Sequence, residues 1–395
     1  MSQKKFNKDL LDTCYQKSIE LLKKNSTEFG VLASSQQRKA QERNYLSIFA
    51  RDAGICVLGM VASGDRKLIA SARRSLETLL KAQARDGEIP NYVKPETQYK
   101  DFWRMECIDA TLWCLIAIKI FDAYSGQKTK LEKKYKKHII KALYWIKCQK
   151  HEQDKLVMQN EASDWADLMP RSGKVLYSNV LWYQVCNLYD LYIKSQVKRN
   201  INNLFFPFGI DKEKVPKCDR ATVKAINKLK PKKYYLSFVN YLFWGRDIDV
   251  YANSLAIIFK LASQKKSREL IDFLDSSKRN KDLAMPVLFN PIKENSRFWR
   301  EYMESHSQNY PFQYHNGGVW PFASCFWAIA LWQSGFQEKA WQELEKVAIL
   351  LKHNDWTFHE WFQAKSGRAH GMHGQSWNAG AFLLAYNILQ KNIKI

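Results

Sequence analysis

The sequence predicts an all-α protein, an (α/α)6 barrel in which six helical hairpins form two concentric layers. Apolar residues recur with helical spacing along the 395-residue chain, and strand-like alternation is scarce. Some helical segments are apolar nearly all round, whereas others carry one charged face, as buried inner helices and half-exposed outer helices require. No repeat of roughly 33–47 residues recurs, which argues against an open α-solenoid.

About twelve helices are expected in chain order. Within 66–83 the apolar positions run from Leu68 to Leu80 at helical spacing, and Asp65 precedes them as a suitable N-cap. Pro321 suits the first turn of a helix, where its missing N–H has no cost. The expected helices lie near 6–24, 50–62, 66–83, 104–124, 128–149, 175–195, 219–228, 249–263, 267–275, 319–334, 336–351 and 375–391.

The connections between these helices are long for an all-α protein, and long loops in a domain are usually functional or disordered. Most of them hold tryptophan together with charged and amide residues, so we expect an active site in the loops at one mouth of the barrel. One stretch differs, because 194–233 is rich in Lys and Arg; we expect a solvent-exposed insertion there. Residues 1–395 then form a single domain. The long connections are 84–103, 150–174, 196–218, 229–248, 276–318 and 352–374.

The net charge and the aromatic content of the chain suggest two classes of ligand, nucleic acids and sugars. The chain has 62 basic and 39 acidic residues, a net charge of +23, and 14% aromatic residues. A basic chain invites a nucleic-acid partner. The tryptophans, however, stand beside Asp, Glu, Asn and Gln, which repel or ignore phosphate. Aromatic faces stack on sugar rings as well as on bases, so we expect a sugar as the ligand and no nucleic-acid function.

The eight cysteines form no C-x-x-C pair, which excludes zinc-ribbon and thioredoxin-like sites. We expect buried free thiols, with no metal site and no cofactor. The first residues contain no apolar segment of the kind that a secretory signal needs. The best apolar run, LWCLIAIKIF, is too short to cross a membrane and contains Lys119. The expected location is the cytoplasm, with no membrane association.

Two acidic motifs could supply catalytic carboxyl groups. One is EASDWADLMPRSG, residues 161–173, and the other is NDWTFHEWFQAKSGRAHG, residues 354–371. Carboxyl groups beside indole rings are partly desolvated, which raises their pKa and suits a general acid. An acid and a base facing each other across a cleft are the minimal equipment of a glycosidase. The alternative is that these carboxylates cap helices or lie on the surface.

Three further blocks carry polar residues at expected helix starts. Arg51 and Asp52 in NYLSIFARDAG could form a buried ion pair or hold hydroxyl groups. Asp109 in RMECIDATLWC lies within an apolar helix and needs a partner, for which a ligand is one candidate. His315 and Asn316 in QYHNGGVWPF precede a glycine turn into the next helix, where a structural role is the alternative.

Together these blocks resemble the (α/α)6 glycoside hydrolases that include the neutral/alkaline invertases and the glucosidase domain of glycogen-debranching enzymes. The resemblance runs from about Gly30 to Tyr386 and rests on five motifs in the order of that group. Their positions here are Tyr45 with Phe49, Arg51 and Asp52; Asp109 to Trp113; Trp165 and Asp167 with Pro170 to Gly173 and Asn179 to Tyr183; His315 to Pro321; and Glu360 to Phe362 with Gln375 to Ala379.

The resemblance implies an inverting glycoside hydrolase acting on a small saccharide, an α-glucoside with sucrose as a candidate. Asp167 would be the general acid, with Asp164 as its rival, and Glu360 the general base, their carboxyl groups about 6.5–9.5 Å apart. Tryptophans 103 and 182 could stack on sugar or pack in the core. The expected substrate-binding residues are Arg51, Asp52, Asp109, Trp165, Arg171, Asn179, His315, Asn316, Trp320, Gln375 and Trp377.

Other functions of such a barrel stay open at this point. A sugar phosphorylase or epimerase would use the same fold, and a carbohydrate-binding protein would use the same aromatic residues without catalysis. The helix near Ala252 departs from the pattern of the group, because Ala252-Asn253-Ser254-Leu255-Ala256 stands where G-N-x-L-A is usual. The contribution of that helix to a sugar subsite is therefore in doubt.

Overall fold

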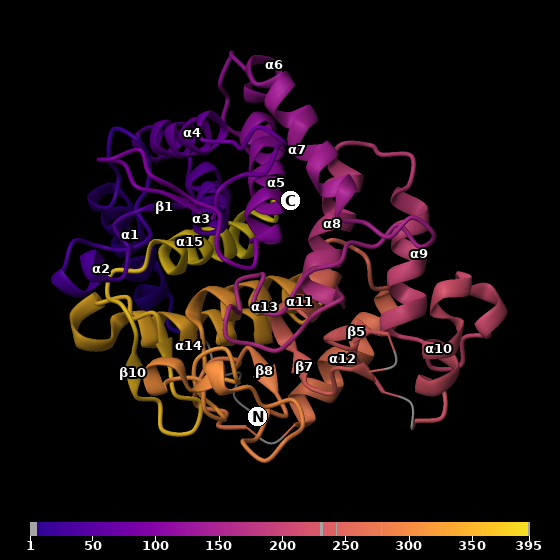
Figure 1. The fold of residues 1–395 in the computed structure, drawn as a ribbon. Helices are drawn as coiled ribbons and strands as arrows, with labels where there is room; N and C mark the ends of the chain where they lie inside the picture. The colour runs from indigo at the N-terminus through magenta and orange to yellow at the C-terminus, as the bar shows by residue number, and fades with distance from the viewer. Residues whose placement is uncertain (1–5, 230–231, 242, 278, 394–395) are drawn as a thin grey trace.

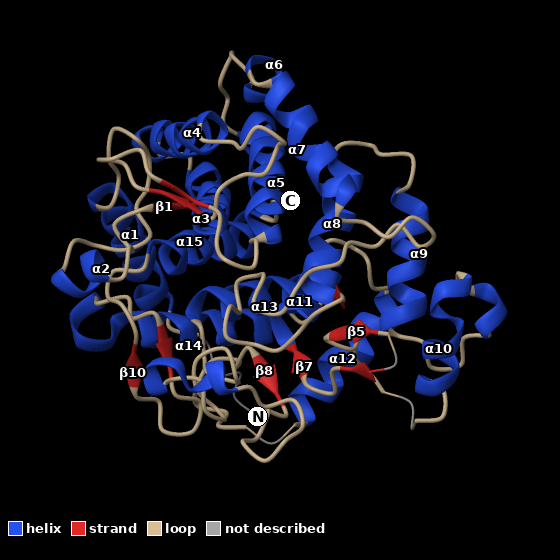
Figure 2. Ribbon diagram, viewed as in Figure 1, coloured by secondary structure: helices blue, strands red, loops and turns tan. Residues whose placement is uncertain are grey.

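Helices dominate the computed structural model, which describes residues 6–229, 232–241, 243–277 and 279–393 (Figure 2). The described α-helices are α1 Lys8–Lys24, α2 Arg38–Glu42, α3 Ala50–Ser63, α4 Arg66–Lys81, α5 Ile108–Tyr124, α6 Leu131–Lys134, α7 Lys136–Cys148, α8 Leu176–Leu188, α9 Lys194–Phe205, α10 Arg220–Ile226, α11 Val250–Ile258, α12 Gln264–Ser276, α13 Pro321–Gln333, α14 Gln337–Trp356 and α15 Ser376–Lys391.

The described strands are two or three residues long and pair in small antiparallel sheets within the loops (Figure 2). Three of them, β1, β4 and β7, run directly into α3, α8 and α11, so the sheets lie at the starts of these helices. The strands are β1 Ile48–Phe49, β2 Tyr92–Val93, β3 Lys100–Asp101, β4 Lys174–Val175, β5 Phe238–Asn240, β6 Phe243–Trp244, β7 Ile248–Asp249, β8 Leu288–Phe289, β9 Trp361–Phe362 and β10 Ala369–His370.

Six helices form a closed inner ring. In order around the ring they are α3, α5, α8, α11, α13 and α15, and α15 packs against α3 to close it (Figure 1). Almost every residue of these helices is buried, including Trp113, Trp182 and Trp327. The nearly all-apolar segments of the sequence are thus the inner layer, because only helices covered on every side can be apolar all round.

The outer layer consists of α1, α4, α7, α9, α12 and α14, which alternate with the inner helices along the chain, with the short helices α2, α6 and α10 between some of them (Figure 1). These helices bury one face only, as α4 does with Leu68, Ala72, Leu76 and Leu79. The expected cap is confirmed, since the Asp65 side chain accepts hydrogen bonds from the N–H groups of Lys67 and Leu68. Pro321 is the first residue of α13, as expected. The alternation of inner and outer helices confirms the predicted (α/α)6 barrel.

Two glycines, one in α3 and one in α15, allow these helices to pack closely where the inner ring of helices closes. A Cβ on Gly59 of α3 would lie 1.9 Å from the carbonyl oxygen of Gly380 on α15, and a Cβ on Gly380 would lie 2.7 Å from Cα of Cys56. No larger residue fits at either position. The two helix backbones therefore touch directly where the first and last inner helices meet.

Several helix boundaries differ from the expectation. The segment 128–149 is two helices, α6 and α7, with a break at Tyr135. The segment 104–124 becomes helical only at Ile108. The regular part of α14 ends before His353, because His353, Asn354 and Asp355 leave the helical conformation.

The largest difference concerns the Lys-rich stretch 194–233, of which residues 230 and 231 lie outside the described residues. Its first part is α9, an outer-layer helix that packs against α8 rather than a surface insertion. Val197, Ile201 and Leu204 lie at helical spacing on its buried face. The many Lys, Arg and Asn residues of the other face concealed this pattern. Only the part from Phe206 to Leu229, with α10, projects beyond the outer layer (Figure 1).

The cysteines and the membrane expectation can be compared directly with the structure. All eight cysteines are free, and six are buried, but Cys148 and Cys218 are exposed, contrary to the expectation of buried thiols. Within the described part of the chain, no helix is long and apolar enough to cross a membrane.

Candidate active site

A cavity of about 200 Å³ lies where inner helices begin. It collects residues from distant parts of the sequence, including both predicted catalytic carboxyl groups. Its lining consists of Arg43, Asn44, Tyr45, Phe49, Arg51, Asp52, Asn91, Tyr92, Asp101, Trp103, Cys107, Asp164, Trp165, Asp167, Tyr314, His315, Trp320, Glu360 and Trp377.

The second residues of the six inner helices form a ring of contacts beneath this cavity, which we call the axial ring. Its members are Arg51, Asp109, Tyr177, Tyr251, Phe322 and Trp377. Each touches the next around the barrel, and Arg51 closes the ring by lying 5.9 Å from the centre of the Trp377 ring. All six helices therefore present their N-terminal ends, which carry partial positive charge, to one mouth of the barrel.

Asp109 is the polar anchor of the axial ring. It is fully buried and accepts hydrogen bonds from Arg51 Nη1 at 3.2 Å and from the Tyr177 hydroxyl at 2.9 Å. It also accepts the backbone N–H of Trp165 at 3.0 Å. Because Trp165 stands two residues before Asp167, this last bond ties the loop that carries Asp167 to the start of α5.

Glu360 is held in place by a hairpin and by a tyrosine. Its Oε1 accepts the hydroxyl of Tyr45 at 2.6 Å, and its Oε2 accepts the backbone N–H of Met372 at 2.9 Å. Burial raises the pKa of the Glu360 carboxyl, while these two hydrogen bonds act in the opposite direction. A carboxylate with two donors is fixed in orientation and stabilised in its charged form.

The hairpin of β9 and β10 leaves room for this carboxylate only because residue 371 is glycine. Gly371 has φ +82°, and a Cβ there would lie 2.2 Å from Glu360 Oε2. Both the backbone conformation and the space exclude a side chain. The glycine that ends the second acidic motif is therefore part of the support of Glu360.

Asp167 has a contrasting environment. Its side chain is 39% exposed into the cavity. The ionisable side chain beside it is His315, whose Nδ1 lies 3.7 Å from Asp167 Oδ1. Burial of the His315 ring lowers the pKa of that imidazole well below its usual value, and the nearby Arg171 and Arg51 act in the same direction. His315 is thus neutral and does not compensate the carboxylate.

Desolvation raises the pKa of Asp167 to about 7; Arg51 counteracts the shift, and Asp164, Glu360 and Asp109 add to it. A carboxyl group with a pKa near 7 is about half protonated at neutral pH, and the protonated form can donate its proton. The rival residue, Asp164, lies differently. It accepts hydrogen bonds from Arg171 at 2.6 Å, from Gln159 at 2.9 Å and from the Ala166 N–H, so its oxygens are already occupied.

Several residues that line the cavity have a buried polar atom without a hydrogen-bond partner in the described protein. Asp52 Oδ1 is an acceptor, and the ring N–H groups of Trp165 and Trp377 are donors. Arg51 Nε and His315 Nδ1 share this property. Buried polar groups without a partner are rare and call for an explanation. A hydroxyl both donates and accepts, so a ligand rich in hydroxyl groups matches this mixed set.

Most of the sequence-predicted site residues reach the cavity. Asp167, Glu360, Arg51, Asp52, Trp165, His315, Trp320 and Trp377 line it, and so does the stacking candidate Trp103. Asp164, the rival acid, lines it as well.

Five predicted substrate-binding residues do not line the cavity. Asp109 lies behind Arg51, and Arg171 is buried between Asp164 and Asp249. Asn179 and Asn316 are occupied by backbone groups of neighbouring loops. Gln375 is fully buried at the start of α15, and its side-chain Nε2 and Oε1 have no hydrogen-bond partner in the described protein. These five side chains lie outside the cavity lining, and their direct contact with substrate stays a prediction.

The sequence reasoning missed the roles of some lining residues. Tyr45 was part of a quoted motif, but nothing in its neighbours along the chain indicates that it contacts a residue 315 positions away. Tyr314 belongs to the quoted block QYHNGGVWPF but was not singled out there, and Asn91 lines the cavity from a loop without a motif of its own. Trp182, the other stacking candidate, is a core residue of α8 whose ring N–H bonds to the Lys155 carbonyl.

The similarity to a known protein family lies in the C-terminal part of the chain. The family model for alkaline and neutral invertase matches residues 246–392, which carry His315, Glu360 and Gln375. This part of the chain is similar to the invertases. The mitochondrial alkaline/neutral invertase C of Arabidopsis thaliana is 26% identical over 144 residues, 35% of this chain and 21% of that protein. Cytosolic invertase 1 of Oryza sativa subsp. japonica is 26% identical over 142 residues, 35% of this chain and 25% of that protein.

The matches span only about a quarter of the length of these curated relatives, and the residues up to 245, which include Asp167, lie outside the family match. The predicted resemblance to this group of glycoside hydrolases is confirmed. It is strongest in the segment 246–392, which contributes Glu360 to the site.

Solved structures match the whole barrel. A GH63 mannosylglycerate hydrolase from Thermus thermophilus, in complex with Tris and D-glycerate, has a TM-score of 0.66 at 13% identity, covering 94% of this chain and 99% of that chain. A bacterial glucoamylase complexed with acarbose has a TM-score of 0.65 at 12% identity, covering 97% of this chain and 56% of that chain. Identities this low show the fold, which is the (α/α)6 barrel of glycosidases.

Proposed function

We propose that this protein is a glycoside hydrolase in which Asp167 is the general acid and Glu360 the general base. The observation that carries the proposal is the unequal environment of two carboxyl groups in one cavity. Asp167 has no hydrogen-bond donor among the described contacts and a pKa raised to about 7. Burial also raises the pKa of Glu360, but two donors there favour the charged form. Such a separation of roles is how two carboxyl groups divide acid and base work.

The proposed reaction is a single displacement with inversion. Asp167 gives its proton to the glycosidic oxygen while Glu360 removes a proton from the water that attacks the anomeric carbon. One bond to the anomeric carbon breaks and one forms, so no covalent intermediate with the protein is needed. Hydrogen bonds from the Tyr45 hydroxyl and the Met372 N–H fix the orientation of the Glu360 carboxylate for this proton transfer.

The proposed substrate is a small saccharide cleaved at its end. The cavity of about 200 Å³ is smaller than the roughly 300–1,000 Å³ of typical small-molecule pockets, which favours a single sugar ring beyond the cleaved bond. The similarity to alkaline and neutral invertases favours an α-glucoside, with sucrose as the first compound to test. We keep the cytoplasm as the proposed location.

The test is hydrolysis of a panel of disaccharides, with NMR detection of the anomer that forms first. We expect inversion, and a loss of about 10²–10⁴-fold in kcat for each of Asp167→Asn and Glu360→Gln. The matched control is Asp355→Asn, because Asp355 belongs to the same acidic motif as Glu360 but is exposed outside the cavity. Its activity should equal that of the unchanged protein.

Three results would count against parts of the proposal. Full activity in both active-site variants would refute the assignment of acid and base. Retention of configuration would refute the single displacement. Turnover that requires inorganic phosphate, with release of a sugar phosphate, would make the protein a phosphorylase on the same barrel.

A further inference from the structure

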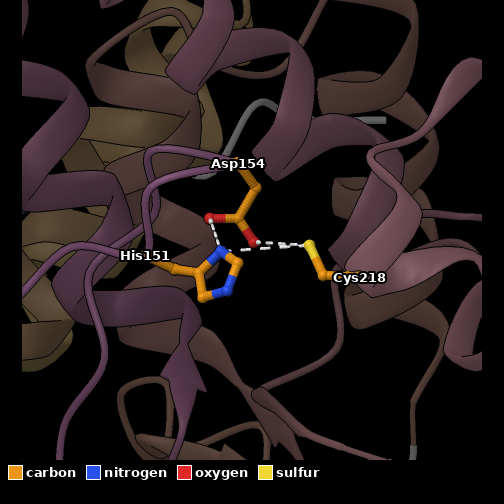
Figure 3. Close-up of side chains that lie close together, drawn as sticks. All are labelled: His151, Asp154 and Cys218. Atoms are coloured by element: carbon orange, nitrogen blue, oxygen red, sulfur yellow. Dashed lines mark hydrogen bonds and ion pairs between the residues drawn. The ribbon is translucent and has the colours of Figure 1, made fainter.

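A histidine, an aspartate and a cysteine lie together at the edge of the barrel, outside the proposed active site (Figure 3). His151 and Asp154 belong to the loop after α7. Cys218 belongs to the 3-10 helix Lys217–Asp219, within the segment 206–229 that projects beyond the outer layer. We call these three residues the edge cluster.

The side chains of the edge cluster converge on one point. His151 Nδ1 lies 3.8 Å from Asp154 Oδ1 and 3.9 Å from Cys218 Sγ, and Cys218 Sγ lies 3.8 Å from Asp154 Oδ2 (Figure 3). One ligand atom from each residue lies within 4.8 Å of the other two. Ligands bound at 2.0–2.3 Å to a tetrahedral ion are about 3.3–3.8 Å apart, so the observed spacing is close to that of a metal site.

Two of the three ligands are already fixed in position. Asp154 is fully buried, its Oδ1 accepts the Leu156 N–H at 2.8 Å, and its carbonyl accepts the Asn200 side chain of α9 at 2.7 Å. The backbone N–H of His151 donates to the Leu156 carbonyl at 2.8 Å, which closes the loop between them. An ion would therefore meet a carboxylate and a loop that are already held in place, and it would share Asp154 Oδ2 with Lys174.

The arrangement does not suit a nucleophilic cysteine. In a cysteine–histidine–aspartate relay, one ring nitrogen faces the thiol and the other faces the carboxylate. Here both neighbours face the same nitrogen, Nδ1 of His151. One nitrogen cannot accept from the thiol and donate to the carboxylate at once, whereas an ion placed between the three groups satisfies all of them.

The charges around the edge cluster also call for a cation. Lys174 forms ion pairs with both Asp154 and Asp219, so one positive charge faces two carboxylates. With Cys218 bound as thiolate the group has a net charge of −2, which a divalent ion neutralises. An imidazole nitrogen, a thiolate and a carboxylate are together the ligand types that zinc prefers.

We propose that His151, Asp154 and Cys218 bind a divalent transition-metal ion of the zinc class, which fastens the segment 206–229 to the barrel. Cys218 lies 64 residues from Asp154 in the sequence, so the ion would join two chain segments that otherwise meet through Lys174 alone among the charged contacts described here. The fourth coordination position is left to water.

Cobalt is the probe for the test, because a thiolate bound to Co²⁺ absorbs through a charge-transfer band that other ligands do not produce. The full-length protein, stripped of metal with a chelator, is titrated with Co²⁺. We expect the band to saturate at one equivalent and to disappear when Zn²⁺ is added. Cys218→Ser should abolish the band, and Cys148→Ser, which alters the other exposed cysteine, should leave it unchanged.

A second variant keeps the test independent of the thiol. His151→Ala should weaken Co²⁺ binding at least tenfold while the circular dichroism spectrum stays that of the unchanged protein. The proposal is wrong if no charge-transfer band forms at saturating Co²⁺, if the band survives in Cys218→Ser, or if His151→Ala binds as tightly as the unchanged protein.

Discussion

Two groups of carboxylates, one around the cavity and one beside the edge cluster, keep buried negative charge in different ways. At the edge cluster, Asp154 and the neighbouring Asp219 share Lys174, so each carboxylate has a cation in contact. Around the cavity, Arg51 donates its hydrogen bond to Asp109, and its Nε lies 3.6 Å from Asp52 Oδ1. Asp167 has only the neutral His315 as an ion-pair neighbour. Two cavity carboxyl groups are thus left without a full partner.

Burial raises carboxyl pKa values in both groups, and it raises the pKa of Asp219 even against the attraction of Lys174. Desolvation raises the pKa of Asp52 to about 7, against the attraction of Arg51, and raises the pKa of Asp167 to the same value. Carboxyl groups that serve structure are paired, because an uncompensated buried charge is costly. Carboxyl groups that must exchange protons near neutral pH are left partly unpaired, and perturbed acidity of this kind marks functional sites.

The largest effect is expected from the removal of Asp109, the residue that links Arg51 and Tyr177 in the axial ring. Asp109→Ala leaves the buried Arg51 without its main partner and also frees the Tyr177 hydroxyl and the Trp165 N–H. We expect the free energy of unfolding to fall by about 3–5 kcal/mol in chemical denaturation. The control is Glu42→Ala, which breaks an exposed pair with Arg38 and should cost about 0–1 kcal/mol. A loss no larger than that of the control would contradict the anchoring role.

The matching change beside the edge cluster is Lys174→Met. It leaves Asp154 and Asp219 without their shared cation, so we expect the free energy of unfolding to fall by about 1–3 kcal/mol. Turnover per folded molecule should stay within about twofold, because the ring and cavity carboxyl groups are untouched. A fall in turnover comparable to that of an active-site variant would show that the two groups are coupled.

A smaller change sharpens the role of the base. Tyr45→Phe removes the hydroxyl that bonds to Glu360 Oε1 at 2.6 Å, and hydrogen bonds to charged groups contribute about 1.5–3 kcal/mol. We expect kcat to fall by roughly 10–100-fold. The lost bond favoured the charged carboxylate, so the pKa of Glu360 rises and the acidic limb of the pH–rate profile moves to higher pH. Tyr192→Phe, on the surface, should change neither quantity.

The mildest test is the pH profile of the unchanged protein. A general acid works only while it holds its proton, and the pKa of Asp167 is raised to about 7. The ratio kcat/KM should therefore fall as pH rises through about 7. Because the pKa of Asp52 is also about 7, Asp52→Asn separates the two groups. If this variant loses the basic limb, Asp52 and not Asp167 is the titrating group.

The fold could be predicted to a large extent because its signal is local. Whether a helix is apolar all round or on one face can be read from its own residues, and this separated inner from outer helices. The prediction failed at α9, where Lys and Arg on the solvent face hid Val197, Ile201 and Leu204. It also merged α6 with α7, since the break at Tyr135 has no proline or glycine to indicate it.

The candidate site was predictable where a motif carried the signal. Asp167, Glu360 and six of the proposed binding residues line the cavity, and all came from short segments that resemble a known group. The axial ring was not foreseen as a unit. Tyr177, Tyr251 and Phe322 look like ordinary core residues in their own helices, and their shared property is position two of an inner helix.

The sequence by itself determined the two layers of helices and the motifs that bring Asp167 and Glu360 to one cavity. These follow from periodicity and from motifs within about twenty residues. Tertiary structure alone decided that six second residues meet in a ring, that Tyr45 reaches Glu360, and that Cys218 reaches His151. Contacts between distant segments depend on how whole helices pack, and no single segment contains that information.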